Sequence, residues 1–373
     1  MDTTPVHDPE SWHQILLLAG SRGASVQLTI MHHGITVLDD AVRCRREALG
    51  WLFSASKPFT SLLIHRLTRR GDLDLDAPVA DLWPEYGAAA RRSKAATTVR
   101  EVLTHRTALP TAGPYPAAVL TMHRREDSVQ RVVRGRRRDR RFAARSAYQP
   151  LDFGFILAEV AQRATGRPWA ELLRELVLEP AGLTDVHPGV PDGELHRCLP
   201  VDGSWHAVPG GPLVAAVVNR RDVRQAQIPA AGISTTAHQL ASLYQHLLTA
   251  PSMDPGTASD AARETASDRE ALCMPSSNGS KDAWTRLPTR WGTGIQLGGT
   301  GEGCPMGVTS TERTFGHNGS DVCLGWADPN LHLAVGLVTD RASGHPADRQ
   351  LLVRVSDAIR RVATSSSSAA TVP

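Results

Sequence analysis

The amino-acid sequence predicts an α/β (α+β) fold, in which an antiparallel sheet flanked by helices is built from both ends of the chain. Apolar and polar residues alternate over residues 24–38, a period-two pattern typical of strands, and residues 322–339 predict two further strands around a turn at 328–330. Between them, residues 72–230 contain no convincing strand pair, and their apolar spacing is helical. Because the two strand regions have to share one sheet, we expect the middle of the chain to form an inserted all-α lobe.

The first elements are a predicted hairpin and a helix. Residues 24–38 turn at His33-Gly34, which predicts two paired strands. From Ser54 onward the apolar residues follow a helical period, and the run closes at Gly71, a residue suited to the left-handed position beyond a helix end. A helix is therefore expected to follow the strands.

The remaining elements follow from the same periodicities and from turn residues. They are, in order, helices at 98–103, 153–165 and 169–178, a helix beginning at a Ser234 cap, strands at 322–327 and 331–339, and a terminal helix containing residues 351–359.

The predicted domain division follows from this order. Residues 1–71 and 231–363 are expected to form the α/β sheet domain, and residues 72–230 the inserted α-helical domain. Residues 364–373 are rich in Ser and Ala and are expected to be a disordered tail. A cleft between the lobes follows from this division, and clefts host ligands.

The composition indicates a globular protein and excludes several kinds of partner. The 373 residues are 41% hydrophobic, and 41 Lys and Arg against 38 Asp and Glu leave a net charge of +3. This charge is too small to make nucleic acid or an anionic membrane the expected partner. The first residues lack the basic and apolar regions of a secretory signal, and no apolar run approaches about 18 residues. We therefore expect a cytoplasmic protein without a membrane partner.

Cysteine and histidine patterns indicate no metal or disulfide framework. The five cysteines are far apart and include no C-x-x-C pair, so they are expected to be free thiols. The 15 histidines include no H-E-x-x-H or carboxylate spacing that would define a metal site. The sequence therefore predicts no metal.

Ser54 and Lys57 form an S-x-x-K pair where the strand-rich stretch gives way to a helix. At this spacing the two side chains lie on one helical face, about one turn apart. Lys57 can then hold or take the Ser54 proton, and the helix N-terminus favours negative charge developing on the nucleophile. The alternative interpretation is a serine cap followed by a surface lysine, and the surrounding residues have to decide between the two.

Those surrounding residues resemble the serine β-lactamase and penicillin-binding protein family, specifically its esterase and transacylase branch near the class C β-lactamases. Residues 53–60 are similar to the family's nucleophile segment, and residues 71–106 to the stretch that follows it. Tyr148 stands at the place of the family's second element, and His317-Asn318-Gly319 at the place of its third. Three separated motifs occur in the family's order, and the resemblance covers residues 24 to 362.

The resemblance implies a serine β-lactamase-like fold and an acyl-transfer mechanism that requires no cofactor. Ser54 would be the nucleophile, and Lys57 and Tyr148 would take its proton, with the phenol pKa of Tyr148 lowered by Lys57. The backbone N–H groups of Ser54 and Ser320 would form the oxyanion hole. The expected substrate-binding residues are His317, Asn318, Gly319, Asp152 and Trp291.

Two departures from the β-lactamase pattern favour an ester substrate. Pro150 replaces the asparagine of the usual Y-x-N, and His317 stands where many members have a lysine, which binds carboxylate better than a neutral imidazole. We therefore expect an esterase or transacylase that works through an acyl-Ser54 intermediate on an ester or related acyl substrate. Its partners would be a small-molecule acyl donor and, for transfer, an amine or alcohol acceptor, as in ester-to-amide exchange in antibiotic biosynthesis. A β-lactamase or D-Ala-D-Ala peptidase is the alternative.

Other interpretations stay open. The ten arginines from Arg124 to Arg145 could form an electropositive lid for an anionic substrate or a solvated loop. One alternative is a catalytically silent family member that only binds a ligand. In that case Ser54→Ala would change no turnover, because the wild-type protein would have none. A nucleic-acid binder working through the arginine run is a remoter possibility, and steep salt dependence would mark it.

Overall fold

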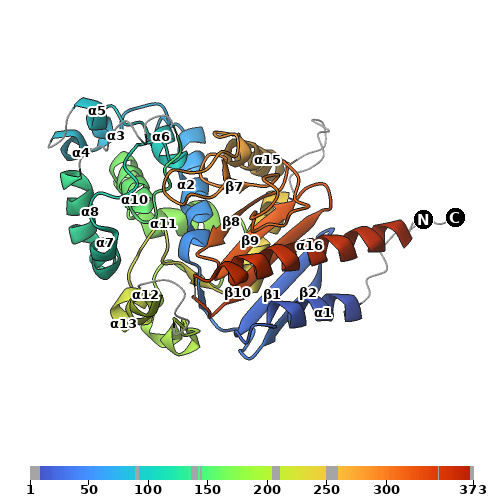
Figure 1. Cartoon of the computed structure of the whole chain (residues 1–373). Helices are drawn as coiled ribbons and strands as arrows, with labels where there is room; N and C mark the ends of the chain where they lie inside the picture. The colour runs from blue at the N-terminus through green and yellow to red at the C-terminus, as the bar shows by residue number, and fades with distance from the viewer. Residues whose placement is uncertain are drawn as a thin grey trace.

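The main feature of the computed structural model is a seven-stranded antiparallel sheet with strand order β2-β1-β10-β9-β8-β7-β6. Its strands come from both ends of the chain, as predicted (Figure 1). The structure describes residues 9–88, 92–135, 142, 145–203, 211–248, 259–342 and 344–369. The strands are β1 (Val26–His32), β2 (Ile35–Val42), β6 (Arg290–Trp291), β7 (Gln296–Leu297), β8 (Phe315–Gly319), β9 (Cys323–Asp328) and β10 (Leu333–Thr339).

Helices cover both faces of this sheet, which explains why its central strands are buried along their whole length. On one face lie α1 (Pro9–Ala19) and α16 (Pro346–Ala369), which pack together and cross the sheet in Figure 1. On the other lies α14 (Ala237–Leu248), which packs against β10. A Cβ added at Gly336 in β10 would lie 2.1 Å from the Ala237 carbonyl oxygen, so only glycine allows α14 to approach this closely.

The chain between the two strand regions is mostly helical. The helices α3 to α8, α10 and α11 gather on one side of the molecule, away from the large sheet (Figure 1). Two-residue strands β3 (Gly50–Trp51), β5 (Ser234–Thr235) and β4 (Val186–His187) form a second sheet in that order. The helical elements are η1 (Phe53–Ser56), α2 (Lys57–Arg69), α3 (Val79–Leu82), α4 (Pro84–Ala88), α5 (Arg92–Ala95), α6 (Val99–Leu103), α7 (Tyr115–Thr121), α8 (Arg125–Arg134), α10 (Asp152–Thr165), α11 (Trp169–Leu173), the π-helix η2 (Arg174–Leu178), η3 (Asp192–Arg197), α12 (Gly211–Val218), α13 (Arg221–Arg224) and α15 (Asp260–Cys273).

Most predicted elements are confirmed, with bounds within one or two residues of those predicted. The five cysteines are free thiols, as predicted. The helix predicted to begin at Ser234 is an exception, because the Ser234 backbone pairs with β3 and β4 in the small sheet. The helix begins at Ala237 instead, where the Thr236 hydroxyl accepts a hydrogen bond from the Gln239 N–H and acts as the cap. The strand β8, which contains His317-Asn318-Gly319 and pairs with β9, was not among the predicted elements.

The predicted tail is also corrected in part. Residues 364–369 continue α16 as helix, where the Thr364 and Ser365 hydroxyls donate hydrogen bonds to carbonyls one turn earlier. Residues 370–373 lie outside the described part of the chain. The division into a sheet domain and an inserted helical domain over 72–230 stays a prediction. Over the described residues, no helix combines the length and apolar character needed to span a membrane.

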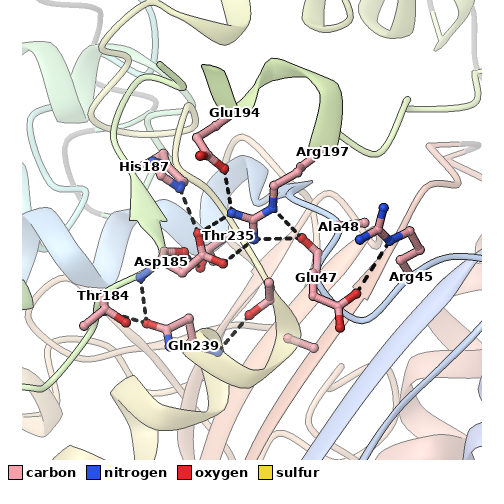
Figure 2. Close-up of polar contacts among 12 residues, drawn as sticks. Arg45, Glu47, Ala48, Thr184, Asp185, His187, Glu194, Arg197, Thr235 and Gln239 are labelled. Atoms are coloured by element: carbon pink, nitrogen blue, oxygen red, sulfur yellow. Dashed lines mark hydrogen bonds and ion pairs between the residues drawn. The ribbon is translucent and has the colours of Figure 1, made fainter. Parts of the chain in front are cut away.

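A polar cluster fixes the chain just ahead of β3 (Figure 2). Arg197 donates hydrogen bonds from Nε and Nη2 to the Glu47 carbonyl oxygen, at 3.0 and 2.8 Å, and from both Nη atoms to the Asp185 carboxylate. Burial alone would raise the pKa of Asp185, but its hydrogen bonds with Arg197 and His187 lower it below its ordinary value. The Arg197 side chain is 21% exposed, so these bonds are partly shielded from water.

We expect Arg197→Met to reduce the free energy of unfolding by about 2 kcal/mol, the usual contribution of hydrogen bonds to charged groups. Urea unfolding followed by circular dichroism measures the change. The matched control is Arg174→Met, because Arg174 and its partner Glu179 are both more than half exposed, and its cost should stay below about 0.5 kcal/mol. Equal losses in the two variants would contradict a stabilising role for the Arg197 cluster.

Candidate functional site

The residues of the S-x-x-K motif lie where β3 leads into the fully buried part of α2. Phe53 has φ 47°, a left-handed conformation that turns the chain sharply before Ser54. The Lys57 N–H donates to the Ser54 carbonyl oxygen in the short helix η1, so both side chains leave the same turn. Ser54 Oγ consequently lies 3.3 Å from Lys57 Nζ, and the alternative of a surface lysine is wrong.

The Lys57 amine is buried among oxygen acceptors. Nζ lies 2.8 Å from the Pro150 carbonyl oxygen and 3.2 Å from that of Ala230. Burial lowers the pKa of Lys57 well below its ordinary value. A neutral amine has two N–H donors and one lone pair. Since the two carbonyls accept the two N–H groups, the lone pair is left for the hydroxyl of Ser54.

Tyr148 approaches Ser54 from another side. Its Oη donates a hydrogen bond to Ser54 Oγ at 2.5 Å, and its ring centroid lies 4.7 Å from Lys57 Nζ. Burial raises the pKa of the phenol, and the hydrogen bond with Ser54 offsets this only in part. The expected lowering by Lys57 is therefore wrong, because the loss of water around a phenolate has the larger effect. At neutral pH Tyr148 carries its proton.

Two aromatic side chains hold the ring of Tyr148. Trp291 stacks on it with 5.4 Å between centroids and 7° between planes, and His105 lies 4.7 Å from it at a tilt. Trp291 is only 1% exposed, so it supports the phenol and does not line the cavity, contrary to its expected role in substrate binding. His105 was not singled out by the sequence, and its place in the segment matching the family was its only signal.

His317 lies behind the site and is also buried. Its Nδ1 lies 2.9 Å from the Asn318 carbonyl oxygen, and its ring centroid lies 6.3 Å from that of Tyr148. Burial and the nearby Lys57 lower the pKa of His317 to about 3, so the imidazole is neutral at physiological pH. It is not among the residues that line the cavity.

The rest of the third motif shapes the backbone beside Ser54. Asn318 forms side-chain hydrogen bonds with both the backbone and the carboxylate of Asp321, which stabilise the turn after β8. A Cβ at Gly319 would lie 2.1 Å from the Leu52 carbonyl oxygen, so only glycine allows β8 to pass this close to the nucleophile turn. Ser320 follows with φ 55° and lines the same cavity as Ser54.

This cavity has a volume of about 290 Å³, and Ser54 is part of its lining. Apolar side chains from α7, α12 and the loop after Tyr148 form most of its wall, and among the described residues that line it none carries a charge. Its lining consists of Trp51, Phe53, Ser54, Tyr115, Pro116, Val119, Met122, Pro150, Leu151, Leu213, Val214, Val218, Ala231, Ser320, Ala342 and Gly344.

Asp152, expected to bind substrate, lies away from this cavity. Its buried carboxylate accepts hydrogen bonds from the Ala112 N–H and from Arg131 Nη2, the latter at 3.2 Å. It therefore joins α10 to α8. Arg125 pairs with Glu159, so these two arginines of the 124–145 run form structural contacts and not a lid. Residues 136–141, 143 and 144 of this run lie outside the described residues.

The described ranges contain no group of three or more His, Cys, Asp or Glu side chains placed to hold a metal ion.

The two carbonyls that bind Lys57 were not predicted from the sequence. Pro150 contributes its backbone oxygen where the Y-x-N pattern has a side chain, and backbone contacts of this kind leave no signal in residue type.

Comparison with known proteins agrees with this geometry. Residues 17–359 match the family model described as Beta-lactamase. Esterase/beta-lactamase LipL of Mycobacterium tuberculosis (strain ATCC 25618 / H37Rv) is 29% identical over 318 residues, which cover 78% of this chain and 68% of LipL.

Two solved structures illustrate the shared fold. EstA from Arthrobacter nitroguajacolicus Rue61a superposes with a TM-score of 0.74 at 24% identity, covering 97% of this chain and 99% of EstA. EstCE1, described as a hydrolase with promiscuous acyltransferase activity, has a TM-score of 0.66 at 17% identity, covering 94% of this chain and 99% of its own. With a matching model over nearly its whole length, the chain belongs to the Beta-lactamase family and is a serine hydrolase of that family.

Proposed function

We propose that this protein cleaves an ester through an acyl-Ser54 intermediate and passes the acyl group to water or to an amine or alcohol, as an esterase or transacylase. The observation that carries the proposal is the contact of Ser54 Oγ with the buried Lys57 amine and the Tyr148 phenol, beside a cavity whose described lining carries no charge. Nucleophile and base are within reach of one another before any substrate binds.

In acylation, Ser54 Oγ attacks the ester carbonyl carbon while its proton moves to the lone pair of Lys57 Nζ. The backbone N–H groups of Ser54 and Ser320 would hold the tetrahedral oxyanion, since both residues border the cavity. When the C–O bond breaks, the leaving alkoxide takes the proton of the Tyr148 phenol, and Lys57 returns its proton to Tyr148. Deacylation repeats these transfers with water, an amine or an alcohol as nucleophile.

The lining of the cavity supports an ester with an apolar group over a β-lactam. Penicillins carry a carboxylate, and no charged side chain of the described lining would pair with it. His317 is neutral and buried, and Pro150 offers only a carbonyl. The name of LipL includes esterase activity and that of EstCE1 acyltransferase activity, which supports both hydrolysis and transfer from the acyl-enzyme. Ester-to-amide exchange is one form that such a transfer would take. A β-lactamase or D-Ala-D-Ala peptidase is the second candidate, which the name of LipL also supports.

Ser54→Ala should abolish covalent labelling by a fluorophosphonate and turnover of p-nitrophenyl esters, because it removes the only atom that forms the acyl bond. Intact-protein mass spectrometry measures the adduct. Ser56→Ala is the matched control, since Ser56 lies in the same turn but is fully buried and accepts a hydrogen bond from the Ile233 N–H.

The proposal fails if the adduct persists in Ser54→Ala. A penicilloyl adduct that forms and turns over faster than the ester adduct would favour the second candidate. Absence of any adduct from the wild-type protein would indicate a catalytically silent family member.

Lys57→Arg should slow fluorophosphonate labelling by about 10³-fold, because a guanidinium stays protonated and has no lone pair for the Ser54 proton. In the wild type, labelling should rise with pH as Lys57 loses its proton. Since burial lowers the pKa of Lys57 well below 10.5, the plateau should be reached well below pH 10.5.

The matched control is Lys94→Arg. Lys94 is also buried and donates to two carbonyl oxygens, those of Val132 and Val133. The Lys94→Arg substitution should leave the rate and the pH profile of Ser54 labelling unchanged. A wild-type midpoint near pH 10.5 would contradict a neutral Lys57.

The apolar cavity should favour longer acyl chains. We expect kcat/KM for p-nitrophenyl hexanoate to exceed that for the acetate by at least about 10-fold, because each buried CH₂ contributes about 0.8 kcal/mol. Val119→Phe narrows the cavity and should reduce the hexanoate rate while leaving the acetate rate nearly unchanged. Equal kcat/KM for the two esters would show that this cavity does not hold the acyl chain.

A further inference from the structure

The proton-transfer group Tyr148 lies in a segment without regular secondary structure. Residues 146–149 belong to neither helix nor strand, yet the Tyr148 phenol has to stay within hydrogen-bond distance of Ser54. Displacement of a reacting group by about 1 Å can reduce a rate by about 100-fold. Other parts of the chain therefore have to hold this segment.

A buried carboxylate from a distant loop contacts this segment directly. Both oxygens of Asp282 accept the Tyr148 N–H, each at 3.1 Å. In the next residue of the loop, the Ala283 N–H donates to the Ser146 carbonyl oxygen at 2.8 Å. Asp282 is 0% exposed, so no water competes for these bonds. The loop thus holds the backbone of the 146–149 segment at two points, Ser146 and Tyr148.

The same carboxylate also contacts the side chain that supports the phenol. Trp291 Nε1 lies 3.4 Å from Asp282 Oδ2, and the Trp291 indole is the ring that stacks on Tyr148. One carboxylate therefore contacts both the backbone of the tyrosine and the aromatic plate behind its ring.

Asp282 is itself held in place within its loop. Its Oδ1 accepts the backbone N–H groups of Trp284 and Thr285, at 2.9 and 3.0 Å, and its own N–H donates to the Leu287 carbonyl oxygen. Four N–H donors, counting those of Tyr148 and Trp291, and the Thr285 hydroxyl thus converge on a carboxylate that lies outside the S-x-x-K, tyrosine and HNG motifs. A buried acceptor shared by several N–H groups is costly to remove, since each donor would lose its partner.

We propose that Asp282 is a positioning residue for the acyl-transfer reaction, which acts by holding the Tyr148 phenol at Ser54 through the Tyr148 N–H and the Trp291 indole. The inference rests on the proposed function, because it assumes that the Tyr148 phenol moves a proton. Asp282 touches neither Ser54 nor the cavity. Its loss should therefore lower kcat and kcat/KM together and leave KM nearly unchanged.

The test is a double-mutant cycle of Asp282 and Tyr148 with p-nitrophenyl butyrate hydrolysis and fluorophosphonate labelling of Ser54 as the two readouts. Asp282→Ala should reduce kcat by about 100-fold with a change in KM below about 3-fold. Asp282→Asn keeps one acceptor oxygen, so it should lose only about 10-fold. In the Tyr148→Phe background, which lacks the phenol, either Asp282 substitution should reduce kcat further by less than about 2-fold.

Asp328→Asn is the control for removing a buried negative charge, because Asp328 is 1% exposed and pairs with Arg360 on another face of the sheet. It should lower the melting temperature but leave kcat within about 2-fold. If Asp282→Ala does not fold, Asp282→Asn decides the outcome in both backgrounds.

Two outcomes would overturn the inference. Equal fold-losses from Asp282→Asn with and without the phenol would show that Asp282 supports the site as a whole and does not act through Tyr148. Full activity in Tyr148→Phe would remove the group that Asp282 is proposed to position. Neither result affects the Ser54 adduct, so failure of the acyl-enzyme proposal is detected separately, by the Ser54→Ala comparison.

Discussion

The burial of the Lys57 amine is the constraint on which the rest of the site depends. A lysine shielded from water is tolerated when it is neutral and when its N–H groups find acceptors. Here the acceptors are the carbonyls of Pro150 and Ala230, which lie far apart in the sequence. Both approach because α10 lies very close to the segment at Ala230, where a Cβ on Gly154 would be 2.3 Å from the Ala230 nitrogen. The chemistry of one amine thus requires three distant segments to meet.

A second close approach joins this helical region to the sheet. β8 passes the nucleophile turn at Gly319, so the backbone of the large sheet lies close to the turn that holds Ser54. The catalytic groups are therefore divided between the two strand regions and the helical region, and small relative movements of these parts would separate them. In the proposed mechanism, this close backbone contact at Gly319 sets how near the oxyanion donor Ser320 lies to the nucleophile Ser54.

The sequence predicted the fold well because its evidence is local or ordered along the chain. Strand alternation, helical periods and the spacing of Ser54 and Lys57 need no knowledge of distant partners. The predictions that were wrong depended on tertiary contacts between residues far apart in the chain. Ser234 looked like a helix cap until its backbone paired with two strands, and Trp291 and Asp152 were assigned to substrate although burial places them behind the cavity wall. The pKa of Tyr148 is raised by burial from water, which depends on tertiary packing. Asp282, whose carboxylate accepts the Tyr148 N–H, lies 134 residues away in the chain.

Burial favours the uncharged form of each titratable group at the site. It lowers the pKa values of Lys57 and His317 and raises that of Tyr148, and no charged side chain of the described residues lines the cavity. In the proposed mechanism, charge appears only when the proton of Ser54 reaches Lys57, at the moment when negative charge develops on the substrate oxygen. In a site shielded from water, this new ammonium stabilises the developing oxyanion more strongly than it would in solvent. A substrate that brings its own carboxylate would meet no such compensation, so the burial that makes Lys57 a base also favours uncharged esters.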